Sequence, residues 1–137
     1  MIELPYAYTY QVVRYLPDRV TGEFINVGVI VFSKEHGFLK ARTTDKTCRL
    51  KALFPKVDTE PLLKDLKNFA DFINDLGEQI KAGTNEIDYN NVYSVVPRDD
   101  SSIIYTEESG GIDRGLDIAF EDLFERLVDY YNEPVRA

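Results

Sequence analysis

The segment from Phe24 to Ser33 constrains the fold of this chain more than any other. It contains an uninterrupted apolar run from Val27 to Phe32. Successive side chains of a strand point to opposite faces, so a run without polar positions is typical of a strand that is covered on both sides or central in its sheet. The run is far shorter than the ~20 residues that span a bilayer. The sequence therefore predicts a buried central strand and no membrane segment.

Two further strands are expected beside this one, because the connections are short. Tyr6 to Leu16 is rich in β-branched and aromatic residues, which favour strands. The turn sequence "PDRVTG" separates it from the central strand, and "KEHG" leads on to a third strand from Phe38 to Thr44. Connections of this length join antiparallel neighbours. The N-terminal part is thus predicted to be an antiparallel meander.

Helical patterns occupy much of the remaining chain. A short helix is expected from Lys46 to Phe54, where Pro55 stops it. A longer helix begins near Asp58 or Thr59 and ends before Gly83, with apolar residues at helical spacing: Leu62, Leu66, Phe69, Ala70, Ile73, Leu76 and Ile80. A final helix is expected from about Asp113 to Tyr131, burying Leu116, Ala119, Phe120, Leu123, Phe124, Leu127 and Val128.

Between the two long helices we expect a short strand at Tyr93–Val96 and a last strand at Ser102–Glu108. Gly110 and Gly111 are expected to break the chain after it. The predicted architecture is a single domain over residues 1–137. It is α+β, with an antiparallel sheet of about four to five strands and two main helices packed on one face.

Charge divides the chain unevenly. Residues 1–56 carry nine Lys/Arg and five Asp/Glu (+4), and residues 57–137 carry seven and nineteen (−12), which together give the net charge of −8. The negative total argues against nucleic-acid binding, which requires cations against phosphates. An acidic stripe recurs every four residues, at Asp113, Asp117, Glu121 and Glu125. It is interpreted as a solvated helix face or as a docking surface for a basic partner. The basic cluster Lys40, Arg42, Lys46, Arg49, Lys51 and Lys56 is interpreted as a solvated edge or as an internal mate for the acidic half.

The residue inventory favours a protein without a catalytic site. The single histidine, His36, is expected in a surface turn, and a serine or cysteine nucleophile usually needs a histidine base. No cofactor is predicted, and no His/Cys cluster has zinc spacing. The only cysteine, Cys48, is expected to be a half-buried structural thiol and suits a reducing compartment. The N-terminal "MIELPYAY" does not resemble a signal peptide, so a cytoplasmic protein is expected.

Polar residues in the first hairpin are the candidate site. Arg14 falls in an apolar row of the first strand, and Asn26 falls in the central strand. An even sum of paired residue numbers would place the two on one face, whereas an odd sum would separate them. A buried Arg14 needs a partner, with Glu23 the nearest carboxylate and Asp18 the second choice. Asn26 close to Gly28 indicates a β-bulge.

Two interpretations of this hairpin stay open. In the first, the charged and amide groups neutralise one another and fix the strand register. In the second, Arg14, Glu23 and Asn26, joined by Arg42, line a pocket or a partner-binding surface. A guanidinium in such a pocket would receive a phosphate or a carboxylate.

The same residues carry a resemblance to a known family. Val13–Asp18 fits the pattern V-R-Y-x-P-D, and Gly22–Val29 fits G-E-F-x-N-V-G-V. "FLKAR" and "CRLKALFP" follow, and "AFEDLFERLV" closes the chain. Together these segments resemble the bacterial family known as domain of unknown function 3037, and the resemblance covers most of the chain.

That family has no assigned activity, and its members tend to be encoded beside HipA-like serine/threonine kinases of the toxin type. The resemblance therefore implies a non-catalytic accessory or regulatory protein that binds a protein partner, with a HipA-like kinase as the expected one, in a setting like that of toxin–antitoxin pairs. A homo-oligomer remains open. The alternative is a small phosphate- or nucleotide-binding domain or enzyme that uses Arg14, Glu23 and Asn26.

Overall fold

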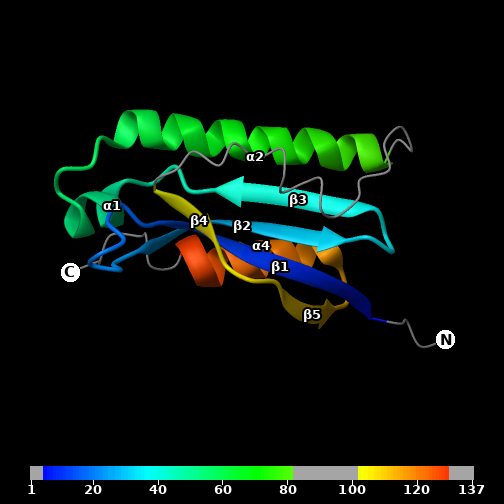
Figure 1. Cartoon of the computed structure of the whole chain (residues 1–137). Coiled ribbons are helices and arrows are strands. Elements are labelled where there is room, and N and C mark those ends of the chain that lie inside the picture. Colours follow the sequence, from blue (N-terminus) through cyan, green and yellow to red (C-terminus); the bar gives the residue numbers. More distant parts are fainter. Residues whose placement is uncertain (1–4, 82–101, 130–137) are drawn as a thin grey trace.

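The computed structural model of the protein describes residues 5–81 and 102–129. Five antiparallel strands form one sheet: β1 (Tyr6–Tyr15), β2 (Ile25–Ser33), β3 (Phe38–Thr43), β4 (Ile103–Tyr105) and β5 (Ser109–Asp113). Their order is β3-β2-β1-β4, and β5 also pairs with β1 (Figure 1). The predicted α+β class and N-terminal meander are confirmed. The expected strand at Tyr93–Val96 and the helix end before Gly83 fall outside the described residues.

The helices are α1 (Cys48–Leu53), α2 (Thr59–Lys81) and α4 (Leu116–Phe124), which continues into a π-helical turn, η1 (Glu125–Asp129). The last helix begins three residues later than predicted, because Asp113 still belongs to β5. The Asp113 carboxylate accepts hydrogen bonds from the backbone N–H groups of Arg114 and Gly115 and so turns the chain into α4. Among the described residues, none of these helices has the length and apolar character that crossing a membrane requires.

Helices α2 and α4 lie on opposite faces of the sheet (Figure 1), so the prediction that both main helices pack on one face is wrong. Ile30 and Phe32 of β2 belong to the core under α2, together with Leu66 and Ile73. Val29 and Val31 belong to a second core under α4, with Phe120, Leu123 and Phe124. The physical reason is the continuous apolar run of β2, which has an apolar side chain for each face.

A β-bulge interrupts the pairing of β1 with β2. Val13 pairs with Gly28, whereas Arg14 pairs with Asn26, so Val27 is the extra residue on β2. The sum of paired numbers is odd before the bulge and even after it. A Cβ at position 28 would lie 2.9 Å from the backbone oxygen of Arg42, which explains the need for glycine there. The bulge expected from Asn26 and Gly28 is confirmed.

Gly110 and Gly111 do not break the chain, contrary to expectation, but form the centre of β5. Tyr8 of β1 pairs with Gly111, and its ring covers the glycine closely enough that a Cβ there would overlap the ring. An aromatic side chain across from a glycine stabilises a strand that has little packing surface of its own. Tertiary packing therefore supplies what the sequence of β5 lacks.

Candidate functional site

Arg14 and Asn26 lie opposite each other, immediately after the bulge, on β1 and β2. The Arg14 Nε donates a hydrogen bond to Asn26 Oδ1 at 3.1 Å. The Asn26 Nδ2 in turn donates to the backbone carbonyl of Leu127 in η1, also at 3.1 Å. We call Arg14, Asn26 and the Leu127 carbonyl the hairpin bridge. It ties the first hairpin to the last helical turn, whose carbonyl end favours a nearby positive charge.

Phe24 supports the guanidinium from the other side. The Arg14 Cζ lies 4.1 Å from the centre of the Phe24 ring, a cation–π contact, and Phe24 itself is 41% exposed. The nearest partners of this half-buried cation are therefore a neutral amide and an aromatic ring. Such a guanidinium retains N–H groups with which to bind a carboxylate or phosphate in two parallel hydrogen bonds.

The two expected carboxylate partners lie elsewhere. Asp18 Oδ1 accepts the backbone N–H of Val20 at 2.9 Å and so shapes the β1–β2 turn. Glu23 is exposed in the same turn, and its backbone N–H donates to Thr21 Oγ1. Within the part of the chain that the structure describes, neither forms an ion pair with Arg14. The bulge, which places Asn26 directly across from Arg14, explains this difference from the expected pairing.

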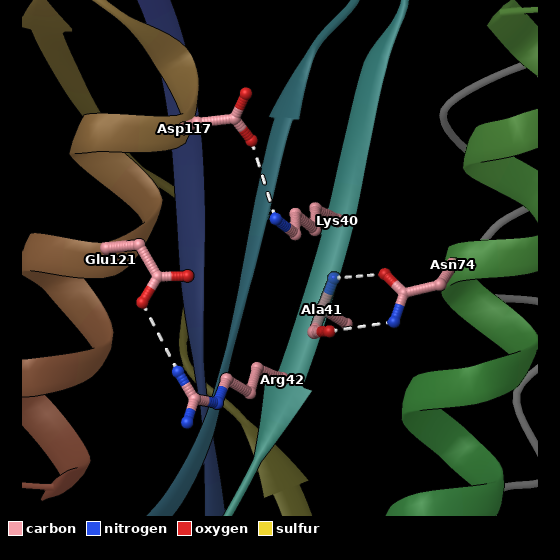
Figure 2. Close-up of polar contacts among 6 residues, drawn as sticks. All are labelled: Lys40, Ala41, Arg42, Asn74, Asp117 and Glu121. Carbon is pink, nitrogen blue, oxygen red and sulfur yellow. Dashed lines mark hydrogen bonds and ion pairs between the residues drawn. The ribbon is translucent and has the colours of Figure 1, made fainter.

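Arg42, the fifth candidate residue, points toward α4. Its Nη1 lies 3.2 Å from Glu121 Oε2, and its Cζ lies 4.2 Å from the centre of the Phe124 ring. Lys40 on the same strand reaches Asp117 at 3.4 Å (Figure 2), and Lys46 reaches Asp129 at 2.8 Å. We call these three pairs the charge ladder.

The charge ladder bears on the two open interpretations of the charged segments. Lys40, Arg42 and Lys46 are internal mates for part of the acidic half, as one interpretation predicted. The pairs at Asp117 and Glu121 are well exposed, and an exposed ion pair contributes only about 0–1 kcal/mol. The ladder therefore orients α4 on the sheet more than it stabilises it, and it occupies two acids of the stripe that a basic partner would use.

The opposite side of β3 is covered by α2. Asn74 Oδ1 accepts the backbone N–H of Ala41, and Asn74 Nδ2 donates to the Ala41 carbonyl, both at 2.9 Å (Figure 2). The side-chain amide thus replaces a neighbouring strand at the sheet edge. Gly77, one turn further along α2, lies so close to the Leu39 carbonyl that a Cβ would overlap its oxygen. Helix and edge strand are in direct contact here.

Sequence reasoning missed Asn74, although a signal for it exists. Asn74 follows Ile73 and lies four residues after Ala70 and three before Gly77, all of which are buried on the inner side of α2. A polar residue on the apolar side of a helix needs a partner inside the protein, because an unpaired buried amide is costly. The amide at this position could have been read as an edge cap.

A shallow cavity of about 390 Å³ lies at the other end of the hairpin from the bridge. Its lining residues are Ala7, Tyr8, Thr9, Phe32, Ser33, Lys34, Glu35 and Glu108. Burial raises the pKa of the Glu108 carboxyl. The Ser33 hydroxyl already donates to the Ala7 carbonyl at 2.9 Å, and the nearby His36 ring packs edge-on against Tyr6. The candidate site residues from the sequence do not line this cavity.

Metal-ligating side chains and the single thiol are the remaining candidate groups. Over residues 5–81 and 102–129, no three His, Cys, Asp or Glu side chains are grouped so that they could hold a metal ion. Cys48 is exposed, contrary to the half-buried position expected for it. The reason is that Cys48 is the first residue of α1, whose buried side chain is Leu50.

Comparison with known proteins places the chain in a family. Searches of curated proteins and of solved structures find no match. A family model described as "Protein of unknown function (DUF3037)" matches residues 10–128. The matched range extends from β1 into η1 and includes the hairpin bridge, Asn74 and every residue of the charge ladder except Asp129. The chain therefore belongs to the DUF3037 family of proteins of unknown function.

Proposed function

We propose that this protein is a non-catalytic module that binds an acidic segment of a protein partner at the end of its first hairpin. One observation carries the proposal. The Arg14 guanidinium is fixed by Asn26 and by the Phe24 ring, yet among the described residues no carboxylate neutralises it. A cation held in one geometry by neutral groups binds a carboxylate with little further loss of conformational entropy.

The surroundings of Arg14 fit a protein partner. Val20, at the tip of the same turn, is 94% exposed, and Phe24 is half-exposed beside it. Arginine and aromatic residues are enriched among the residues that dominate binding energy at protein interfaces. We call Arg14, Val20 and Phe24 the hairpin surface.

The resemblance discussed above makes a HipA-like serine/threonine kinase the first partner to test. In this proposal the protein is a cytoplasmic accessory or regulatory subunit of that kinase, as in toxin–antitoxin-like pairs. The kinase would supply an acidic or phosphorylated segment for Arg14 and apolar side chains for Val20 and Phe24.

The test is co-expression with a HipA-like kinase, followed by size-exclusion chromatography and isothermal titration calorimetry. Arg14→Lys keeps the charge but removes the planar fork, and it is expected to weaken binding about tenfold, or ~1.4 kcal/mol. Arg126→Lys is the matched control, because Arg126 is an exposed arginine on η1 that pairs with Asp122, and the same substitution there also keeps the charge. Separation of the wild-type protein from the kinase would overturn the kinase as partner. Equal weakening by the control would overturn the role of Arg14.

A second candidate function uses the same guanidinium, which has no carboxylate partner among the described residues, for a small anion. Arg14, with the neighbouring Asn26 amide, would bind a phosphate or nucleotide, whereas Glu23 lies in the turn and is not part of that arrangement. Titration with inorganic phosphate and with ATP tests it. Saturable binding that Arg14→Lys abolishes would favour the anion site over a protein partner.

A further inference from the structure

Strand β5 is an outer strand of the sheet, and its outward backbone groups can be identified. Val12 of β1 donates its N–H to Thr106 Oγ1 and accepts from the Thr106 N–H, so its polar backbone groups face the β4–β5 side. Direction alternates along an antiparallel strand, so Tyr8 and Tyr10 face the same side and bond their partners Gly111 and Ser109. Gly110 and Ile112 therefore direct their N–H and C=O groups away from β1.

The edge of β5 is exposed among the described residues. Within residues 5–81 and 102–129, β5 pairs with β1 alone. Its sequence, Ser109–Asp113, contains neither proline nor lysine, the residues that commonly block an edge. Ile112 is 67% exposed, and a Cβ at Gly110 would meet no atom within 4 Å. The opposite edge, β3, is covered by α2 and capped by Asn74, so among the described residues the sheet is closed on one side and open on the other.

We propose that β5 pairs antiparallel with β5 of a second copy of this chain, about a twofold axis at Gly111, so that one sheet continues through both copies. Only registers that join outward-facing residues make hydrogen bonds, which requires an even sum of paired numbers. In the proposed register, Gly110 of each copy lies opposite Ile112 of the other. This inference goes beyond the proposed function and uses a different surface.

Charge selects this register from its neighbours. In the proposed register Glu108, which precedes β5, lies opposite Arg114 of the second copy, and the symmetry makes this pair twice. Moving the register so that Gly110 faces Gly110 would place Asp113 opposite Glu107, and like charges directly opposite each other destabilise a sheet. Moving it the other way, so that Ile112 faces Ile112, would place Arg114 opposite Gly110. Neither Glu108 nor Arg114 would then have an oppositely charged residue across from it.

Packing favours the same arrangement. Ile112 and Gly110 share one face of β5, opposite to the face on which Tyr8 covers Gly111. In the proposed register, Ile112 of each copy lies across the open space above Gly110 of the other. The two isoleucines are then diagonal neighbours, within reach of each other. The glycine and the exposed isoleucine, which would be liabilities on a free edge, become complementary surfaces.

Sedimentation velocity and amide hydrogen exchange of the full chain, from low to high micromolar concentration, test the interface. We expect the apparent mass to rise toward that of a dimer, with the Gly110 and Ile112 amides exchanging more slowly as it does. Ile112→Lys places two like charges at the axis and should abolish both changes. Because Ile112 is exposed, this variant should retain the thermal midpoint of the wild type. A monomer at every concentration, or a dimer that tolerates Ile112→Lys, would overturn the proposal.

Charge reversal tests the register. Glu108→Arg and Arg114→Glu should each weaken self-association at least tenfold, and the double variant should restore it. Glu107→Arg is the matched control, because in this register Glu107 faces Gly115 of the second copy and its reversal should change little. Failure of the double variant to restore association would overturn the register. These variants leave Arg14 and Phe24 intact, so loss of the dimer and loss of kinase binding can be distinguished.

Discussion

Asn26 illustrates how one side chain serves three parts of the molecule. It accepts from Arg14 on β1, donates to Leu127 in η1, and lies on β2 beside the bulge. An amide has both a donor and an acceptor, so it can join a cation to a carbonyl, which a carboxylate cannot do. Asn26→Leu should lower the free energy of unfolding by about 1–3 kcal/mol, because two polar groups lose their partners. Urea denaturation measures this.

A matched control exists for that substitution. Asn68 on α2 is exposed, and Asn68→Leu should change stability by no more than about 0.5 kcal/mol. If Asn26→Leu were equally neutral, the hairpin bridge would be a surface contact without energetic weight.

At Gly77 two effects of a substitution to alanine oppose each other, the higher helix preference of alanine and the close contact with Leu39. Replacing a glycine inside a helix with alanine usually gains about 1 kcal/mol. Here the added Cβ would overlap the Leu39 carbonyl oxygen, and a backbone atom cannot move aside by changing rotamer. Forced overpacking costs about 1–3 kcal/mol, so Gly77→Ala should destabilise the protein despite its helix preference. Thermal unfolding beside Asn68→Ala, which gains the preference without the overlap, separates the two effects, and a higher midpoint for Gly77→Ala would refute the close contact.

At the level of elements, β3 is held between two helices in two different ways (Figure 2). On one side, Lys40 and Arg42 of β3 form exposed ion pairs that orient α4. On the other side, the Asn74 amide of α2 forms hydrogen bonds directly with the backbone of Ala41 in β3. The first kind of contact is weak and screened by salt, whereas the second satisfies partly buried backbone groups. The edge strand should therefore depend on Asn74 more than on the charge ladder.

Asn74→Leu tests this difference. It leaves the Ala41 N–H and C=O without partners, so we expect a loss of about 2–4 kcal/mol and faster hydrogen exchange of the Ala41 amide. Asn74→Asp keeps an acceptor for the N–H and should preserve part of that amide's protection. Arg42→Gln, which removes one rung of the ladder, should cost less than about 1 kcal/mol. Unchanged exchange at Ala41 in Asn74→Leu would contradict the edge cap.

The whole molecule consists of a sheet between two helical layers, with a core on each face. Tyr15 belongs to the core under α2, and Tyr8 packs against the core under α4. Burial raises the pKa of both phenols above the ordinary 10.0, and Asp113 adds to the effect at Tyr8. Each layer therefore contains a phenol that ionises less readily in the folded state than in the unfolded chain.

This gives an alkaline limit to stability. The unfolded chain loses these phenolic protons near pH 10, whereas the folded protein keeps them to higher pH, so it binds more protons there. The contribution of these two phenols to the free energy of unfolding should be constant below about pH 10. It should fall as the pH rises above that value. Tyr8→Phe and Tyr15→Phe should each flatten the fall, as followed by urea denaturation at several alkaline pH values. An unchanged slope in both variants would contradict the assignment.

The sequence by itself determined the elements whose signals are local. Alternation and apolar runs placed β1, β2 and β3, helical spacing placed α2, and the Asn26–Gly28 pair marked the bulge. The pattern also showed that β2 is apolar on both faces. The sequence of neither helix, however, indicates which face that helix covers. The stripe of each fits either side of a sheet, and only the packing of the whole chain assigns them.

Tertiary structure alone decided the contacts between distant segments. Asn26, rather than Glu23 or Asp18, faces Arg14 because the bulge changes the register after Val13. Gly110 and Gly111 form a strand because they pair with β1, some hundred residues earlier, where the Tyr8 ring covers Gly111. Arg42 pairs with Glu121 and is not near Arg14, because its side chain lies on the side of β3 that faces α4. Helix and strand preferences depend on residues that are neighbours along the chain. The partner of a polar group depends instead on how distant segments pack together, and the energy of that packing cannot be read from any one segment.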